Sequence, residues 1–98
     1  MGPDFDKLMQ CARRFAQILG ADFPADTEVR ERLDDILVRR GAYEAVARQL
    51  TTKDELVSLI LDHLQTLLAP ELMVARDSPR KPWDDEDLVA SVYQALFG

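Results

Sequence analysis

The chain has 98 residues, 47% of them hydrophobic and 31% charged, and its 18 acids and 12 bases give a formal net charge of -6. This length suits one domain with one hydrophobic core, and this composition excludes both a disordered tail and an integral membrane protein. Its single cysteine, Cys11, excludes an internal disulfide and a thiolate-rich metal site. We therefore expect a single domain over residues 1–98.

The acidic excess lies in the second half of the chain. Residues 1–49 carry nine acids and eight bases, whereas residues 50–98 carry nine acids and four bases. Binding to a phosphate backbone needs clustered Lys and Arg, so this distribution disfavours nucleic acid; it favours a basic partner or simply serves solubility. The sequence shows no signal-peptide pattern and no apolar run near the roughly 18 residues of a membrane span, so we expect a cytoplasmic protein.

The first predicted helix spans about residues 4–19. Its apolar residues recur at steps of three and four, which is typical of one buried helical face. They are Phe5, Leu8, Met9, Ala12, Phe15, Ala16 and Leu19. Gly20 follows at the position where a helix commonly ends in a left-handed residue.

A second helix is expected to begin at Asp26 or Thr27, whose side chains are able to cap it, and to end at Gly41. Its predicted apolar face consists of Val29, Leu33, Ile36 and Leu37. A short third helix should follow, with Tyr43, Val46, Ala47 and Leu50 on one side.

Thr52 and Glu55 match a capping box, in which the two side chains satisfy each other's backbone N–H groups before an apolar run. The helix that follows, to about residue 68, is apolar around more than one narrow stripe. We expect it to run through the middle of the bundle or to offer a second face to a partner, a second copy of the chain included.

Two prolines and no periodicity mark residues 76–82 as a loop. The last helix should then carry Leu88, Val89, Val92, Tyr93, Leu96 and Phe97 on its apolar side. No alternating strand pattern of useful length appears. The sequence therefore predicts an all-α protein, a small bundle of four main helices and one short helix.

The stretch between the loop and the last helix is the predicted partner-binding site, because an aromatic residue bordered by charge is typical of an interface anchor. The candidate residues are Arg80, Lys81, Trp83, Asp84, Asp85, Glu86 and Asp87. A structural explanation is available for the same residues. Trp83 and Leu88 have the spacing of a hydrophobic staple, and the acids complement the positive end of the helix dipole.

No catalytic, cofactor or metal site is expected. His63 is the only imidazole and stands on a leucine-rich helix, so no nucleophile–base pair involving histidine is indicated. Cys11 is expected to be a small buried hydrophobe just off the apolar face of its helix. The neighbouring acids Asp34 and Asp35 do not have calcium-loop spacing.

The leading hypothesis is a non-catalytic protein-binding domain, in its most concrete form an acidic inhibitor of a basic, nucleic-acid-binding enzyme. The alternative is a divergent helix-turn-helix regulator, because residues 43–64 have the outline of a short helix, a turn and a longer helix. The start of that longer helix offers Lys53, Asp54, Glu55 and Ser58, a set poorly suited to reading bases.

Overall fold

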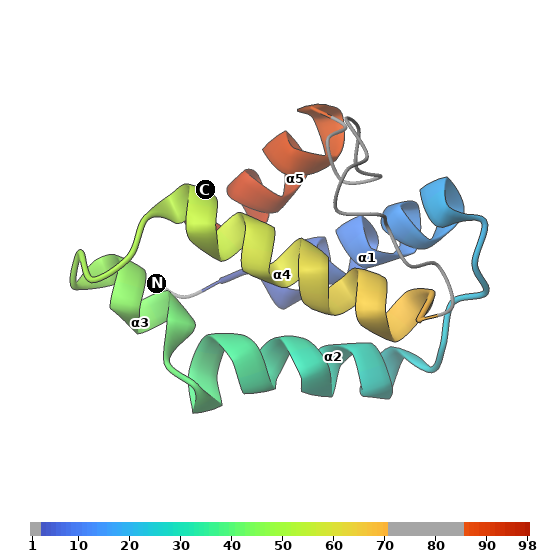
Figure 1. Cartoon of the computed structure of the whole chain (residues 1–98), viewed down its shortest axis with the longest axis horizontal. Coiled ribbons are helices and arrows are strands. Elements are labelled where there is room, and N and C mark those ends of the chain that lie inside the picture. Colours follow the sequence, from blue (N-terminus) through green and yellow to red (C-terminus); the bar gives the residue numbers. More distant parts are fainter. Residues whose placement is uncertain (1–2, 71–85) are drawn as a thin grey trace.

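The computed structural model describes residues 3–70 and 86–98. Within these ranges every regular element is helical: α1 (Phe5–Leu19), α2 (Asp26–Asp34), the π-helical η1 (Asp35–Arg39), α3 (Ala42–Ala47), α4 (Lys53–Leu68) and α5 (Glu86–Phe97). α2 and η1 form one continuous rod, and α4 crosses between α2 and α5 (Figure 1). The predicted all-α bundle of four main helices and one short one is confirmed over the described residues.

α1 has a polar cap at its start and a glycine at its end. The Asp4 carboxylate accepts a hydrogen bond from the backbone N–H of Lys7 (3.1 Å), and Gly20 adopts the left-handed conformation (φ 69°). Both features satisfy backbone groups that have no partner inside the helix. The predicted bounds are confirmed to within one residue.

The start of α2 differs from the prediction that Asp26 or Thr27 caps it. The cap residue is Ala25, without a side-chain hydrogen bond, and Asp26 is already helical. Its carboxylate instead lies 2.5 Å from the guanidinium of Arg13 on α1, so the acid joins two helices. The predicted stop at Gly41 is confirmed, since Gly41 is left-handed (φ 70°).

The four apolar residues predicted for this rod, Val29, Leu33, Ile36 and Leu37, are all buried. In contrast, the apolar side predicted for the third helix is confirmed only in part, because Tyr43 and Val46 face the core whereas Ala47 and Leu50 are exposed. α3 ends at Ala47 and buries none of its residues fully, although Tyr43 and Val46 pack partly against the core. Leu50 lies beyond the end of α3 and is 76% exposed.

Half of the predicted capping box is present at the start of α4. The Thr52 hydroxyl accepts a hydrogen bond from the backbone N–H of Glu55 (3.1 Å). The carboxylate of Glu55 accepts a hydrogen bond from the Thr51 hydroxyl. The acid is thus bonded to the turn before the helix.

α4 is the central helix of the bundle, as one of the two predicted alternatives proposed. It contacts α1, α2, α3 and α5. Its buried residues are Leu56, Val57, Ile60, Leu61, Leu64 and Leu68. α5 packs mainly on α1, and the backbone N–H of Asp4 donates to the carbonyl of Ala95 (2.7 Å). Among the described residues, no helix has the length and apolar character needed to cross a membrane.

Candidate interaction site

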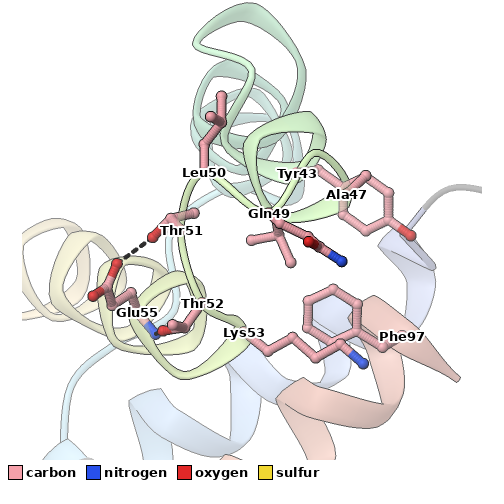
Figure 2. A pocket seen from close by; sticks show the side chains of 10 residues that line it. Tyr43, Ala47, Gln49, Leu50, Thr51, Thr52, Lys53, Glu55 and Phe97 are labelled. Atoms are coloured by element: carbon pink, nitrogen blue, oxygen red, sulfur yellow. Dashed lines mark hydrogen bonds between the residues drawn. The ribbon is translucent and has the colours of Figure 1, made fainter.

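An open groove of about 690 Å³ lies where the connection between α3 and α4 meets the end of α5. We call it the corner groove (Figure 2). Its lining residues are Tyr43, Val46, Ala47, Gln49, Leu50, Thr51, Thr52, Lys53, Glu55 and Phe97. Because its walls come from three helices, its shape depends on the tertiary fold.

Aromatic rings form one wall of the corner groove. The rings of Tyr43 and Phe97 are stacked, with centroids 5.9 Å apart and an angle of 16° between planes. Tyr93 packs on Phe97 at the same distance in a tilted arrangement. The ammonium group of Lys53 lies 5.0 Å from the centre of the Phe97 ring, within range of a cation–π interaction. These contacts hold the end of α5 against α3 and the start of α4.

The turn after α3 is built around Gln49, which is left-handed with φ 62°. The N–H of Gln49 donates to the carbonyl of Val46 (3.0 Å), and that of Leu50 donates to the carbonyl of Ala45 (2.8 Å). This is the hydrogen-bond pattern of a Schellman motif, whose left-handed position normally holds glycine. A residue with a Cβ is strained there by about 1–2 kcal/mol. The Gln49 side chain points into the groove (Figure 2).

Leu50 is the most exposed large apolar side chain among the described residues, at 76%. In a Schellman motif the residue after the left-handed position usually packs back on the helix. Leu50 instead projects away from the groove floor beside Thr51 (Figure 2). A single exposed leucine is ordinary, but this one adjoins a strained backbone and an open groove.

The solvent side of α4 is acidic. At 3.6 residues per turn, the residues opposite its buried side form one stripe along the helix. These exposed or partly exposed residues, which we call the acidic α4 face, are Glu55, Ser58, Leu59, Asp62 and Thr66. Lys53, the only lysine or arginine of α4, lies over the Phe97 ring instead. The acidic α4 face therefore has two carboxylates and no lysine or arginine.

Tyr93 links α5 to the start of α4 beside the groove. Its hydroxyl donates a hydrogen bond to the Asp54 carboxylate. This hydrogen bond, with smaller contributions from desolvation and from the negative charge of Asp54, raises the pKa of Tyr93 above its ordinary value of 10.0. The phenol thus stays neutral and able to donate at physiological pH.

The structure describes only two of the predicted partner-binding residues. Glu86 and Asp87 are exposed in the first turn of α5, and an Asp87 carboxylate oxygen lies 3.8 Å from the Arg14 guanidinium. Phe97 of the corner groove is at the other end of α5, about 15 Å along the helix axis from Asp87. The other candidates, Arg80, Lys81, Trp83, Asp84 and Asp85, lie outside the described residues. Of the two residues of the proposed staple, only Leu88 is described, and it is buried.

Cys11 and His63, two of the residues considered for chemistry, lie on different helices, α1 and α4. Cys11 is buried within the α1 face, further in than predicted, and burial raises the pKa of its thiol, partly opposed by the charge of Arg14. His63 is partly buried on α4. Over residues 3–70 and 86–98, no three His, Cys, Asp or Glu side chains come together as metal ligands.

Comparisons with models of protein families, with curated proteins and with solved structures give no match to the chain.

Proposed function

We propose that this chain is a non-catalytic protein-binding domain whose partner is basic. One observation carries the proposal: Leu50, 76% exposed, follows a left-handed glutamine at the rim of an aromatic-walled groove. Backbone strain persists only where the surrounding structure maintains it, and it is concentrated at binding and catalytic sites. An exposed apolar side chain beside such a position is a suitable anchor for a partner.

The charge distribution supports a basic partner. α4 and α5 together carry five acids and one lysine, and the whole chain has a formal net charge of -6. Opposite charge on a partner would steer the encounter and disfavour acidic competitors. In its most concrete form, we propose that the chain inhibits a nucleic-acid-binding enzyme. Carboxylates of this chain would then occupy the positions on the enzyme that nucleic-acid phosphates would take. Participation of Trp83 and the acids of 84–87 remains part of this proposal.

A non-catalytic role agrees with the state of the potential nucleophile. A buried thiol with a raised pKa holds little thiolate, so Cys11 is a poor nucleophile. The helix-turn-helix alternative finds less support. Although α3, the turn and α4 have the expected outline, α4 is the central core helix, and its solvent side is acidic.

The test is affinity capture by three baits: the unchanged chain, Leu50→Ser, and Ile18→Ser as a matched control. Ile18 is also an exposed apolar residue, at the far end of α1. We expect a partner that Leu50→Ser loses and Ile18→Ser retains, confirmed with the purified partner by calorimetry. Affinity should fall between about 50 and 500 mM salt, because screening weakens exposed charge pairs. Equal capture by all three baits, or affinity that is flat with salt, would contradict the proposal.

A further inference from the structure

We infer that the acidic α4 face, together with Leu50, is the docking surface, and that its occupant is a basic amphipathic helix of the partner protein. This inference rests on the proposed function and makes it specific. It names a surface that shares Leu50 and Glu55 with the corner groove and continues along α4, and it names an occupant of stated chemistry.

Two exposed leucines supply the apolar contact. Leu50 is 76% exposed and Leu59 is 39% exposed. The hydroxyl of Thr51, next to Leu50, donates to Glu55, and Leu59 lies one helical turn after Glu55. Both leucines thus adjoin Glu55, Leu50 from the turn before α4 and Leu59 from the next turn of the helix.

Charge complementarity identifies the occupant. Glu55 and Asp62 lie four residues before and three residues after Leu59, so a carboxylate borders the leucine on each side along the helix. A helix with leucines on one face and lysines or arginines beside them complements this arrangement. The corner groove does not carry charge of one sign, because its lining includes both Lys53 and Glu55.

The same charges disfavour other occupants. Two copies of the acidic α4 face would bring carboxylates together, and a phosphate backbone or an anionic membrane would be repelled. Arg39 and Arg40, candidates for a basic surface on a second copy, lie 3.7 Å and 3.0 Å from the carboxylates of Asp34 and Asp35. A separate basic partner is therefore favoured over self-association.

The experiment uses a synthetic helix-forming peptide of about 14 residues, with leucines at helical spacing on one face and lysines beside them. It is titrated into the isotopically labelled protein and followed by two-dimensional NMR. A second peptide has glutamates in place of the lysines. The lysine peptide should shift the amide resonances of Leu59 and Asp62, and the glutamate peptide should not.

Two matched variants test the charges. Glu55→Gln with Asp62→Asn removes two carboxylates from the acidic α4 face, and Glu28→Gln with Glu31→Gln removes two exposed carboxylates from α2. The first pair should weaken binding of the lysine peptide roughly 3- to 10-fold, the effect of two exposed ion pairs, and the second less than 2-fold.

The inference is overturned if the lysine peptide shifts only resonances away from α4, if it shifts none, or if both variant pairs weaken binding equally. It is also overturned if light scattering shows a stable dimer that Leu59→Ser dissociates, because a second copy would then be the occupant. The proposed function fails separately. If Leu50→Ser abolishes capture of the partner while the α4 variants change nothing, the binding role stands and this docking surface is wrong.

Discussion

Two helices of this molecule end in the same hydrogen-bonded turn with different residues at the left-handed position. After α1, Gly20 bonds to Gln17 and Ala21 bonds to Ala16 (3.1 and 2.9 Å). After α3, the corresponding turn has Gln49 at the left-handed position and Leu50 after it. The first turn has the residue that the conformation favours, whereas the second has a strained residue followed by an exposed leucine.

The turn after α1 has the residue that makes this conformation most stable. The turn after α3 has residues that do not, which suggests that they serve a purpose other than stability. Local sequence preference and global fold agree at Gly20, as they do in most of a foldable protein. They disagree at Gln49, and such disagreements are expected at functional sites. The strained turn is also the one that borders the corner groove. The comparison therefore supports the α3–α4 corner as the binding end of the molecule.

The largest expected effect contrasts the core with the corner. Leu64→Ala removes a fully buried side chain of α4 and should lower the free energy of unfolding by about 3 kcal/mol, through lost transfer energy and the cavity left behind. Leu50→Ala should change it by about 0.5 kcal/mol or less, because the side chain is already in water. Urea denaturation measures both. A loss above about 2 kcal/mol for Leu50→Ala would show that Leu50 supports the fold and would weaken its role as an anchor.

The next effect exchanges the residues of the two turns. Gly20→Gln should lower the free energy of unfolding by about 1 kcal/mol, because it introduces a Cβ at positive φ. Gln49→Gly should raise it by about 0.5 kcal/mol, because strain is relieved while the unfolded chain gains freedom. Thermal denaturation of both variants gives the comparison. If Gln49→Gly is destabilising, the glutamine side chain contributes to stability. Its presence at the left-handed position would then be explained without a role in binding.

Most of the fold was predictable because its determinants are local. The caps at Asp4 and Thr52, and the glycine stops at Gly20 and Gly41, depend on residues within a few positions of each other. The failure at Leu50 has a physical cause. The residue continues the apolar spacing of α3, but the left-handed Gln49 ends the helix first and turns Leu50 out of that face.

The candidate site was less predictable, because it depends on contacts between distant residues. Tyr43 and Phe97 are 54 positions apart, and no local pattern places their rings together. The acidic α4 face was partly foreseeable, because the apolar residues of this helix cover more than one stripe and some of them therefore lie outside the core. Its exposed leucine is recognisable only once the buried side of α4 is known. The predicted role of Trp83 and its neighbours stays a prediction.

A smaller effect compares the caps of α1 and α4. Asp4→Ala and Thr52→Ala each remove one acceptor for a free backbone N–H, and each should cost about 1 kcal/mol of unfolding free energy. Thr52→Ser keeps the acceptor and should cost much less. Hydrogen exchange of the backbone amides shows which helix is affected. If Thr52→Ala increases exchange at the start of α4 without affecting α1, the corner opens separately from the rest of the bundle.

The smallest effect concerns Tyr93, and it sharpens the comparison by changing the pH instead of the packing. Because the pKa of Tyr93 in the folded protein is above the ordinary value of 10.0, its hydrogen bond to Asp54 contributes stability that is fully present below pH 10. That contribution is lost as the pH rises through the folded-state pKa, since the ionised phenolate has no proton to donate and repels the carboxylate. Tyr93→Phe should therefore have a slightly lower Tm than the unchanged chain at pH 7, and this difference should shrink above pH 10. Ultraviolet titration of the phenols supplies the control, because Tyr93→Phe should remove the raised pKa. A Tm difference that stays constant from pH 7 to above the raised pKa would mean that the Tyr93 hydroxyl does not stabilise the corner through Asp54.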